Sequence, residues 1–143
     1  MSTSSKVVLA DGVFDGLHVG HIAHLEAARK LGDKLVVALA SDEFVQKRKG
    51  PDLPKFNAKE RETALRALRC VDDVMVTNDP MALAWSLQPA IYVKGREYEA
   101  HLKDPCSDFA VMALNITRNG GEVVFTDTML GSSSSLLNDN GNL

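Results

Sequence analysis

Short apolar runs of strand length alternate with amphipathic stretches along most of the chain. The runs are Lys6–Ala10, Leu35–Ala40, Val74–Val76, Ile91–Val93 and Glu122–Phe125. Because they are continuously apolar, each strand must be buried on both faces, as in a parallel sheet covered by helices. The pattern therefore predicts an α/β fold, a doubly wound (Rossmann-like) parallel sheet of about five strands with helices on both faces.

Helix signals fill the intervals between these runs. We expect helices over residues 21–31, from a capping box at Asn57 and Glu60, from Pro80 to Leu87, over residues 107–118 and over residues 132–137. The chain has 143 residues, which suits one domain over 1–143, with flexible ends at 1–5 and 139–143.

Charge and cysteine usage exclude several function classes. The net charge of −3 does not favour non-specific nucleic-acid binding, so any phosphate site must be built locally. No apolar run reaches the roughly 20 residues that span a bilayer, which predicts no membrane association. Cys70 and Cys106 lie far apart and lack metal-ligand spacing, which favours a reducing, cytoplasmic setting without a metal site.

Ligands of such sheets bind at the carboxyl ends of the strands. We therefore expect the site in the loops DGVFDGLHVGH at 11–21, KGREYE at 94–99 and TDTMLGSSSS at 126–135. His18 and His21, three residues apart at a helix start, project to nearly the same side. With the helix N–H donors they would form an anion site suited to phosphate. A packing role for the pair remains open, whereas a metal clip lacks an obvious third ligand.

Several motifs occur in a characteristic order. They are Gly12–His21 (GVFDGLHVGH), Lys47–Gly50 (KRKG), Glu60-Arg61, Val93–Gly95 (VKG) with Tyr98, and Ser132–Leu137 (SSSSLL). This series resembles the HxGH nucleotidylyltransferase (cytidylyltransferase-like) superfamily over residues 6–138. The chain looks closest to the adenylyltransferase domain of ADP-heptose synthase and is also similar to glycerol-3-phosphate cytidylyltransferase.

The resemblance implies an enzyme that transfers a nucleotidyl group. A phosphate oxygen of the acceptor would attack the α-phosphorus of a nucleoside triphosphate, with ATP favoured, and pyrophosphate would leave. The acceptor would be a phosphorylated sugar or polyol such as a heptose 1-phosphate. Mg²⁺ would be held mainly by the nucleotide, with no metal ligands assigned to the protein. A homodimer is expected by this resemblance alone.

Roles also follow from the resemblance, residue by residue. His18, His21 and Lys49 would be catalytic, with Lys47 and Lys49 on a mobile loop. Nucleotide binding would involve Gly12, Val13, Phe14, Asp15, Gly20, Lys47, Arg61, Lys94, Gly95, Ser132, Ser133 and Ser134.

Two alternatives remain, a CTP-dependent enzyme of the glycerol-3-phosphate type and a non-catalytic nucleotide-binding module. Residues 127–132 (DTMLGS) lack the arginine that the cytidylyltransferases carry before the terminal helix, which counts against the first. Residues 99–118 form a longer segment than the heptose branch usually has, and this segment borders the expected acceptor side. The identity of the acceptor, and whether a kinase partner supplies it, therefore stay open.

Overall fold

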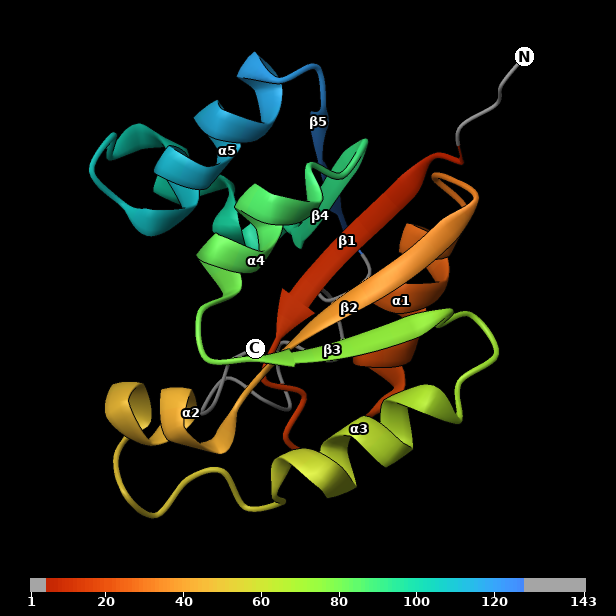
Figure 1. Cartoon of the computed structure of the whole chain (residues 1–143), viewed down its shortest axis with the longest axis vertical. Helices are drawn as coiled ribbons and strands as arrows, with labels where there is room; N and C mark the ends of the chain where they lie inside the picture. Colours follow the sequence, from red (N-terminus) through yellow and green to blue (C-terminus); the bar gives the residue numbers. More distant parts are fainter. Residues whose placement is uncertain (1–4, 128–143) are drawn as a thin grey trace.

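A five-stranded parallel sheet forms the centre of the computed structural model, in which residues 5–127 are described (Figure 1). The strands are β1 (Val7–Gly12), β2 (Lys34–Ala40), β3 (Asp73–Thr77), β4 (Ile91–Gly95) and β5 (Glu122–Thr126). Their order is β3-β2-β1-β4-β5, and every neighbouring pair is parallel. The predicted fold class is confirmed.

Helices cover both faces of this sheet (Figure 1). On one face lie α1 (Val19–Arg29) and α3 (Ala58–Arg66). On the other lie α4 (Pro80–Leu87) and α5 (Asp108–Arg118). A further helix, α2 (Asp42–Lys49), follows β2, and a 3₁₀ helix, η1 (Arg96–Lys103), follows β4.

Alternate side chains of each strand enter two separate cores, because successive residues of a strand point to opposite faces. Val8, Ala10 and Val37 belong to the core under α1 and α3. Leu9 and Tyr92 belong to the core under α4 and α5. Asp11 and Lys94 share the parity of Leu9 and Tyr92, so they face the α4/α5 side.

The order of the strands reverses next to β1. The chain moves from β1 to β2 and β3 on one side, then crosses to β4 and β5 on the other. Ala10 pairs with Val93, so the carboxyl ends of β1 and β4 lie side by side there. A crevice outside such a switch point is the usual ligand site of these sheets.

Helix α2 is the main element that the sequence patterns did not predict. Ser41 caps it by accepting a hydrogen bond from the Phe44 backbone N–H, and basic residues fill its last turn. That combination of an N-cap and charges complementary to the helix dipole is a usable signal. The predicted capping box of Asn57 and Glu60 is confirmed at α3.

Two further expectations concern a terminal helix and a membrane-spanning helix. The helix expected at 132–137 lies outside the described residues. Within residues 5–127, no helix has the length and apolar character needed to cross a membrane.

Candidate functional site

The loop between β1 and α1 begins with a close backbone-to-ring contact. A Cβ atom at Gly12 would lie 2.9 Å from the ring of Phe14, which is buried in the core. The turn itself uses positive φ angles at Phe14 (50°) and Gly16 (98°). Gly12 therefore makes room for Phe14, and Gly16 supplies the conformational freedom that the turn requires.

His18 and His21 cap the start of α1 reciprocally. The Gly20 N–H donates to His18 Nδ1 at 3.0 Å, and the His18 N–H donates to His21 Nδ1 at 3.3 Å. The two ring centroids lie 3.9 Å apart. Because each Nδ1 accepts a hydrogen bond, it carries no proton, and each neutral ring has its proton on Nε2.

The hydrogen bonds to Nδ1 leave the Nε2 atoms as the donors that the two rings offer. Burial lowers the pKa of His21 to about 4, and the repulsion that His18 and His24 would exert on a second positive charge acts in the same direction, so the His21 ring is uncharged at pH 7. His18 Nε2 is buried and has no hydrogen-bond partner within residues 5–127. Two of the backbone N–H groups expected to be free at this helix start, those of His18 and Gly20, donate to the histidine rings. The Nε2–H groups of the rings remain as donors in their place.

His24, one turn further along α1, is buried. Its Nδ1 lies 2.6 Å from Thr126 Oγ1 at the end of β5. Burial lowers the pKa of His24 to about 4, with the charge of Lys94 acting in the same direction and that of Asp11 opposing it. This ring packs between α1 and the sheet.

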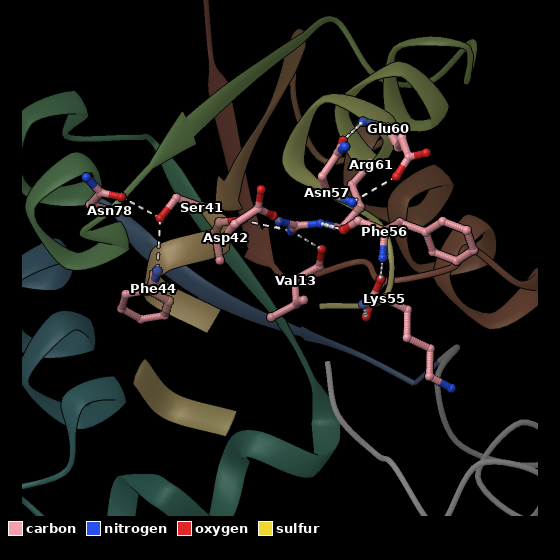
Figure 2. A network of polar contacts seen from close by, with 12 residues as sticks. Val13, Ser41, Asp42, Phe44, Lys55, Phe56, Asn57, Glu60, Arg61 and Asn78 are labelled. Carbon is pink, nitrogen blue, oxygen red and sulfur yellow. Dashed lines mark hydrogen bonds and ion pairs between the residues drawn. The ribbon is translucent and has the colours of Figure 1, made fainter. Parts of the chain in front are cut away.

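Arg61 is a fully buried cation, with 2% of its surface exposed. Its Nε donates to the Phe56 carbonyl, its Nη1 to the carbonyls of Val13 and Ala40, and its Nη2 to Asp42 (Figure 2). Four of its five N–H donors are thus taken by the protein itself. These bonds give Arg61 a structural role, because they join the segments that contain Val13, Ala40 and Phe56. Its expected contact with the nucleotide stays a prediction.

Asp15 connects the same loops from the other side. Its carboxylate accepts the backbone N–H groups of Lys55 and Phe56 at 2.6 and 2.9 Å. Together with the bond from Arg61 to the Val13 carbonyl, these contacts hold the β1–α1 loop against the segment that precedes α3. Asp15 therefore shapes the loop, and both of its oxygens have partners.

The cations of α2 border the site from the β2 side. Lys47 and Lys49 were expected on a mobile loop, but both lie in the last turn of this helix. Lys47 is exposed, 3.9 Å from Glu43. Burial lowers the pKa of Lys49, with the Asp15 carboxylate opposing the shift. Lys49 is the more enclosed of the two.

A cavity of about 430 Å³ opens at the switch point on the α4/α5 side. Its polar floor consists of Asp11 and Lys94, and Lys94 Nζ lies 2.7 Å from Asp11 Oδ1. Tyr92 donates its hydroxyl to Asp11 Oδ2 at 2.6 Å. Aromatic side chains form part of the wall, and two cations of α2, Arg48 and Lys49, also line it. The sequence did not indicate Tyr92, because a tyrosine inside an apolar strand looks like core.

Most of the predicted residues gather at one edge of the sheet. The β1–α1 loop, Lys49, Lys94 and Gly95 all lie at the carboxyl ends of β1, β2 and β4. The predicted residues Ser132, Ser133 and Ser134 lie outside the described residues. Among the described residues, no group of three or more His, Cys, Asp or Glu side chains is placed to hold a metal ion.

Comparison with known proteins places this geometry in a family. The cytidylyltransferase-like family model matches residues 9–127. The chain is 38% identical over 134 residues to the bifunctional protein HldE of Azorhizobium caulinodans, covering 92% of this chain and 26% of that protein. HldE of Gluconobacter oxydans is also 38% identical, over 135 residues. The chain spans about a quarter of the length of these curated relatives.

Two solved structures share the fold of this chain. A lipopolysaccharide core biosynthesis protein from Thermoplasma volcanium superposes with a TM-score of 0.67 at 30% identity, covering 87% of this chain and 98% of that one. A protein of unknown function from Archaeoglobus fulgidus, 19% identical with a TM-score of 0.63, shares the fold. The resemblance inferred from the motifs is confirmed, and so is the assignment to the nucleotidyltransferases. The chain belongs to the cytidylyltransferase-like family.

Proposed function

We propose that this domain transfers a nucleoside monophosphate from a nucleoside triphosphate, with ATP favoured, to a phosphorylated sugar such as a heptose 1-phosphate, releasing pyrophosphate. The observation that carries the proposal is the reciprocally capped histidine pair, in which both Nδ1 atoms accept backbone N–H groups and the Nε2 of His18 has no partner within residues 5–127. Similarity to the bifunctional protein HldE supports a sugar phosphate as the acceptor.

In this reaction an acceptor phosphate oxygen forms a bond to the α-phosphorus while the bond to the pyrophosphate oxygen breaks. No side-chain nucleophile is needed, so the protein contributes position and charge stabilisation. His18 and His21 would donate Nε2–H hydrogen bonds to non-bridging phosphate oxygens. Because His21 is neutral at pH 7, this contact orients the phosphate, and the cationic contribution comes from α2.

Lys49 would supply that positive charge from the last turn of α2. It makes no ion pair within 4 Å with residues 5–127, so its ammonium is available to a phosphate. Mg²⁺ would neutralise the triphosphate, and the nucleotide would provide most of its ligands, since the described residues offer no cluster of three candidate ligands.

The two substrates would approach the switch point from opposite faces of the sheet. The triphosphate would lie over the start of α1, on the α1/α3 side. The acceptor would enter the cavity of about 430 Å³ on the α4/α5 side, lined by Lys49 and Lys94. In this proposed arrangement an acceptor phosphate at the rim of the cavity would approach the α-phosphorus from the side opposite the leaving pyrophosphate. We also propose that the domain works as a homodimer in the cytoplasm.

Pyrophosphate release tests the proposal. ATP, CTP, GTP and UTP are each paired with heptose, hexose and glycerol phosphates in the presence of Mg²⁺, and pyrophosphate is measured with a coupled assay. We expect release with ATP and a sugar 1-phosphate. Release only with CTP and glycerol 3-phosphate would support the alternative cytidylyltransferase. Tight nucleotide binding without release from any pair would indicate a non-catalytic module.

A further inference from the structure

One ion pair lies across the two strands at which the sheet order reverses. Asp11 is next to the last residue of β1, and Lys94 is next to the last residue of β4. Both side chains point to the α4/α5 side and line the cavity there. Both are largely buried, with 11% of the Asp11 side chain and 16% of the Lys94 side chain exposed. The pair therefore forms a floor that a ligand in the cavity would touch.

The contacts of this pair leave part of its hydrogen-bonding capacity unused. Lys94 Nζ lies 2.7 Å from Asp11 Oδ1 and 4.3 Å from the centroid of the Tyr98 ring. Asp11 Oδ2 accepts the Tyr92 hydroxyl. A carboxylate has about four acceptor positions and an ammonium three donors. Each group thus retains capacity for a further partner.

The charge state of the floor selects the kind of partner. Burial would lower the pKa of Lys94, but Asp11, Tyr98 and Glu97 outweigh it and the net pKa is raised, so the ammonium stays charged. Next to the Asp11 carboxylate, that charge is neutralised. A phosphate would be attracted by Lys94 and repelled by Asp11 at the same short range. A hydroxyl can accept from the ammonium and donate to the carboxylate at once.

The rest of the cavity fits a hydroxyl-bearing, phosphorylated ligand. Two cations of α2 line another wall. Within residues 5–127 Lys49 has no ion-pair partner within 4 Å, and Arg48 pairs with the exposed Asp108 at 3.2 Å and lies over the Phe44 ring. A phosphate would find its charge there. Aromatic and thioether side chains form much of the remaining lining, beside the polar side chains of Asp79, His101 and Asp108. They offer apolar surface to the C–H face of a sugar ring and are Phe44, Met81, Tyr92, Tyr98 and Phe109.

We propose that Asp11 is a specificity-determining residue of the acceptor site. With Lys94 it binds a hydroxyl group of a phosphorylated sugar, while the cations of α2 bind the phosphate. This proposal rests on the proposed function, and it moves Lys94 from the expected nucleotide site to one half of a neutral hydroxyl-binding pair.

Binding measurements on Asp11→Asn test this role. The substitution keeps the size and removes the charge, and Asp52→Asn, at an exposed residue without a hydrogen bond or ion pair to the described residues, is the matched control. Heptose 1-phosphate, mannose 1-phosphate, glycerol 3-phosphate and inorganic phosphate are titrated by NMR into the full chain. In Asp11→Asn we expect affinity for the best sugar phosphate to fall about tenfold or more. Affinity for inorganic phosphate and for ATP should change less than about twofold.

Tyr92→Phe provides a second variant should Asp11→Asn fail to fold. It removes one donor to Asp11 without changing any charge, so we expect a loss of about twofold to fivefold for the sugar phosphate alone. Equal changes for sugar phosphate and inorganic phosphate would overturn the proposal, because Lys94 would then bind phosphate. No binding of any sugar phosphate, with ATP still bound, would also overturn it. If the wild-type chain bound no ATP, the proposed function would be refuted instead.

Discussion

Two buried cations of this domain differ in how completely the protein satisfies them. Arg61 has four of its five N–H donors bonded to three carbonyls and a carboxylate. Lys94 has one carboxylate and an aromatic face, and it lines a cavity. Both were expected to bind the nucleotide. The count of donors left over separates a cation that stabilises the fold from one that is available to a ligand.

Replacing Arg61 gives the largest expected effect. Arg61→Ala removes the bonds to Asp42 and to the carbonyls of Val13, Ala40 and Phe56, and breaking such a buried or half-buried network costs about 3–5 kcal/mol. Urea unfolding monitored by circular dichroism measures the loss. Arg69→Ala, at an exposed arginine shortly after the same helix, should leave the transition unchanged. A stable Arg61→Ala protein whose nucleotide affinity alone had fallen would reverse the comparison.

Replacing Lys94 should affect the ligand more than the fold. Lys94→Met keeps most of the apolar stem and removes the charged donor, so we expect the KM for the acceptor to rise about 10–100-fold. The KM for ATP should change little. Because Asp11 keeps the bond from Tyr92, the loss of unfolding free energy should be smaller than in Arg61→Ala. Equal losses of stability in the two variants would remove the distinction between the two cations.

The histidine pair extends the comparison to neutral groups. His18→Ala and His21→Ala should each lower kcat at least about tenfold, because a donor to the reacting phosphates is lost. His21→Asn can keep the cap, since its amide occupies the place of Nδ1, and should retain stability while losing activity. His21→Gln presents an amide near the place of Nε2 and should retain part of the activity. Wild-type turnover in all three His21 variants would show that His21 only caps the helix.

Lowering the pH from 7 to 5.5 should change the free energy of unfolding by the smallest amount of these tests. His21 and His24 have pKa values lowered from 6.5 to about 4, so the folded state binds fewer protons than the unfolded state between these values. Their contribution to stability is complete above pH 6.5 and is lost as the pH falls toward 4. Between pH 7 and 5.5 each ring should cost on the order of 1 kcal/mol. Urea midpoints measured at both pH values in the wild type and in His24→Gln test this prediction. If the unfolding free energy of His24→Gln depended on pH as strongly as that of the wild type, the prediction would be contradicted.

Most of the fold could be predicted from the sequence, because strands that are buried in a sheet are written as runs of apolar residues. Continuous apolar runs identified all five strands, and Pro80 and the Asn57–Glu60 box located two helices. Helix α2 was expected to be a loop, because the resemblance predicted a mobile loop at Lys47 and Lys49. The N-cap at Ser41 is the local signal that indicates a helix there. Tertiary hydrogen bonds decided the roles of Arg61 and Asp15, and no local pattern reports them.

The site was predictable where it depends on one segment and unpredictable where it depends on two. The pairing of His18 with His21 follows from their spacing on one helix. The pairing of Asp11 with Lys94 requires that β1 and β4 be neighbours, which depends on the crossover in strand order. A carboxylate that precedes a glycine-rich loop therefore looked like part of that loop, although its partners come from a strand about eighty residues later.

The central position of β1 has a consequence for thermal motion. This strand is bonded to neighbours on both sides, while β3 and β5 are edge strands of the described sheet. Local opening begins where few bonds must break, at edges and chain ends. Fluctuations that open β3 or fray β5 therefore leave β1 paired, with Asp11 held in it and the loop to His18 attached at its end. Opening of the edge strands therefore leaves the relative positions of Asp11, Lys94 and the start of the β1–α1 loop unchanged.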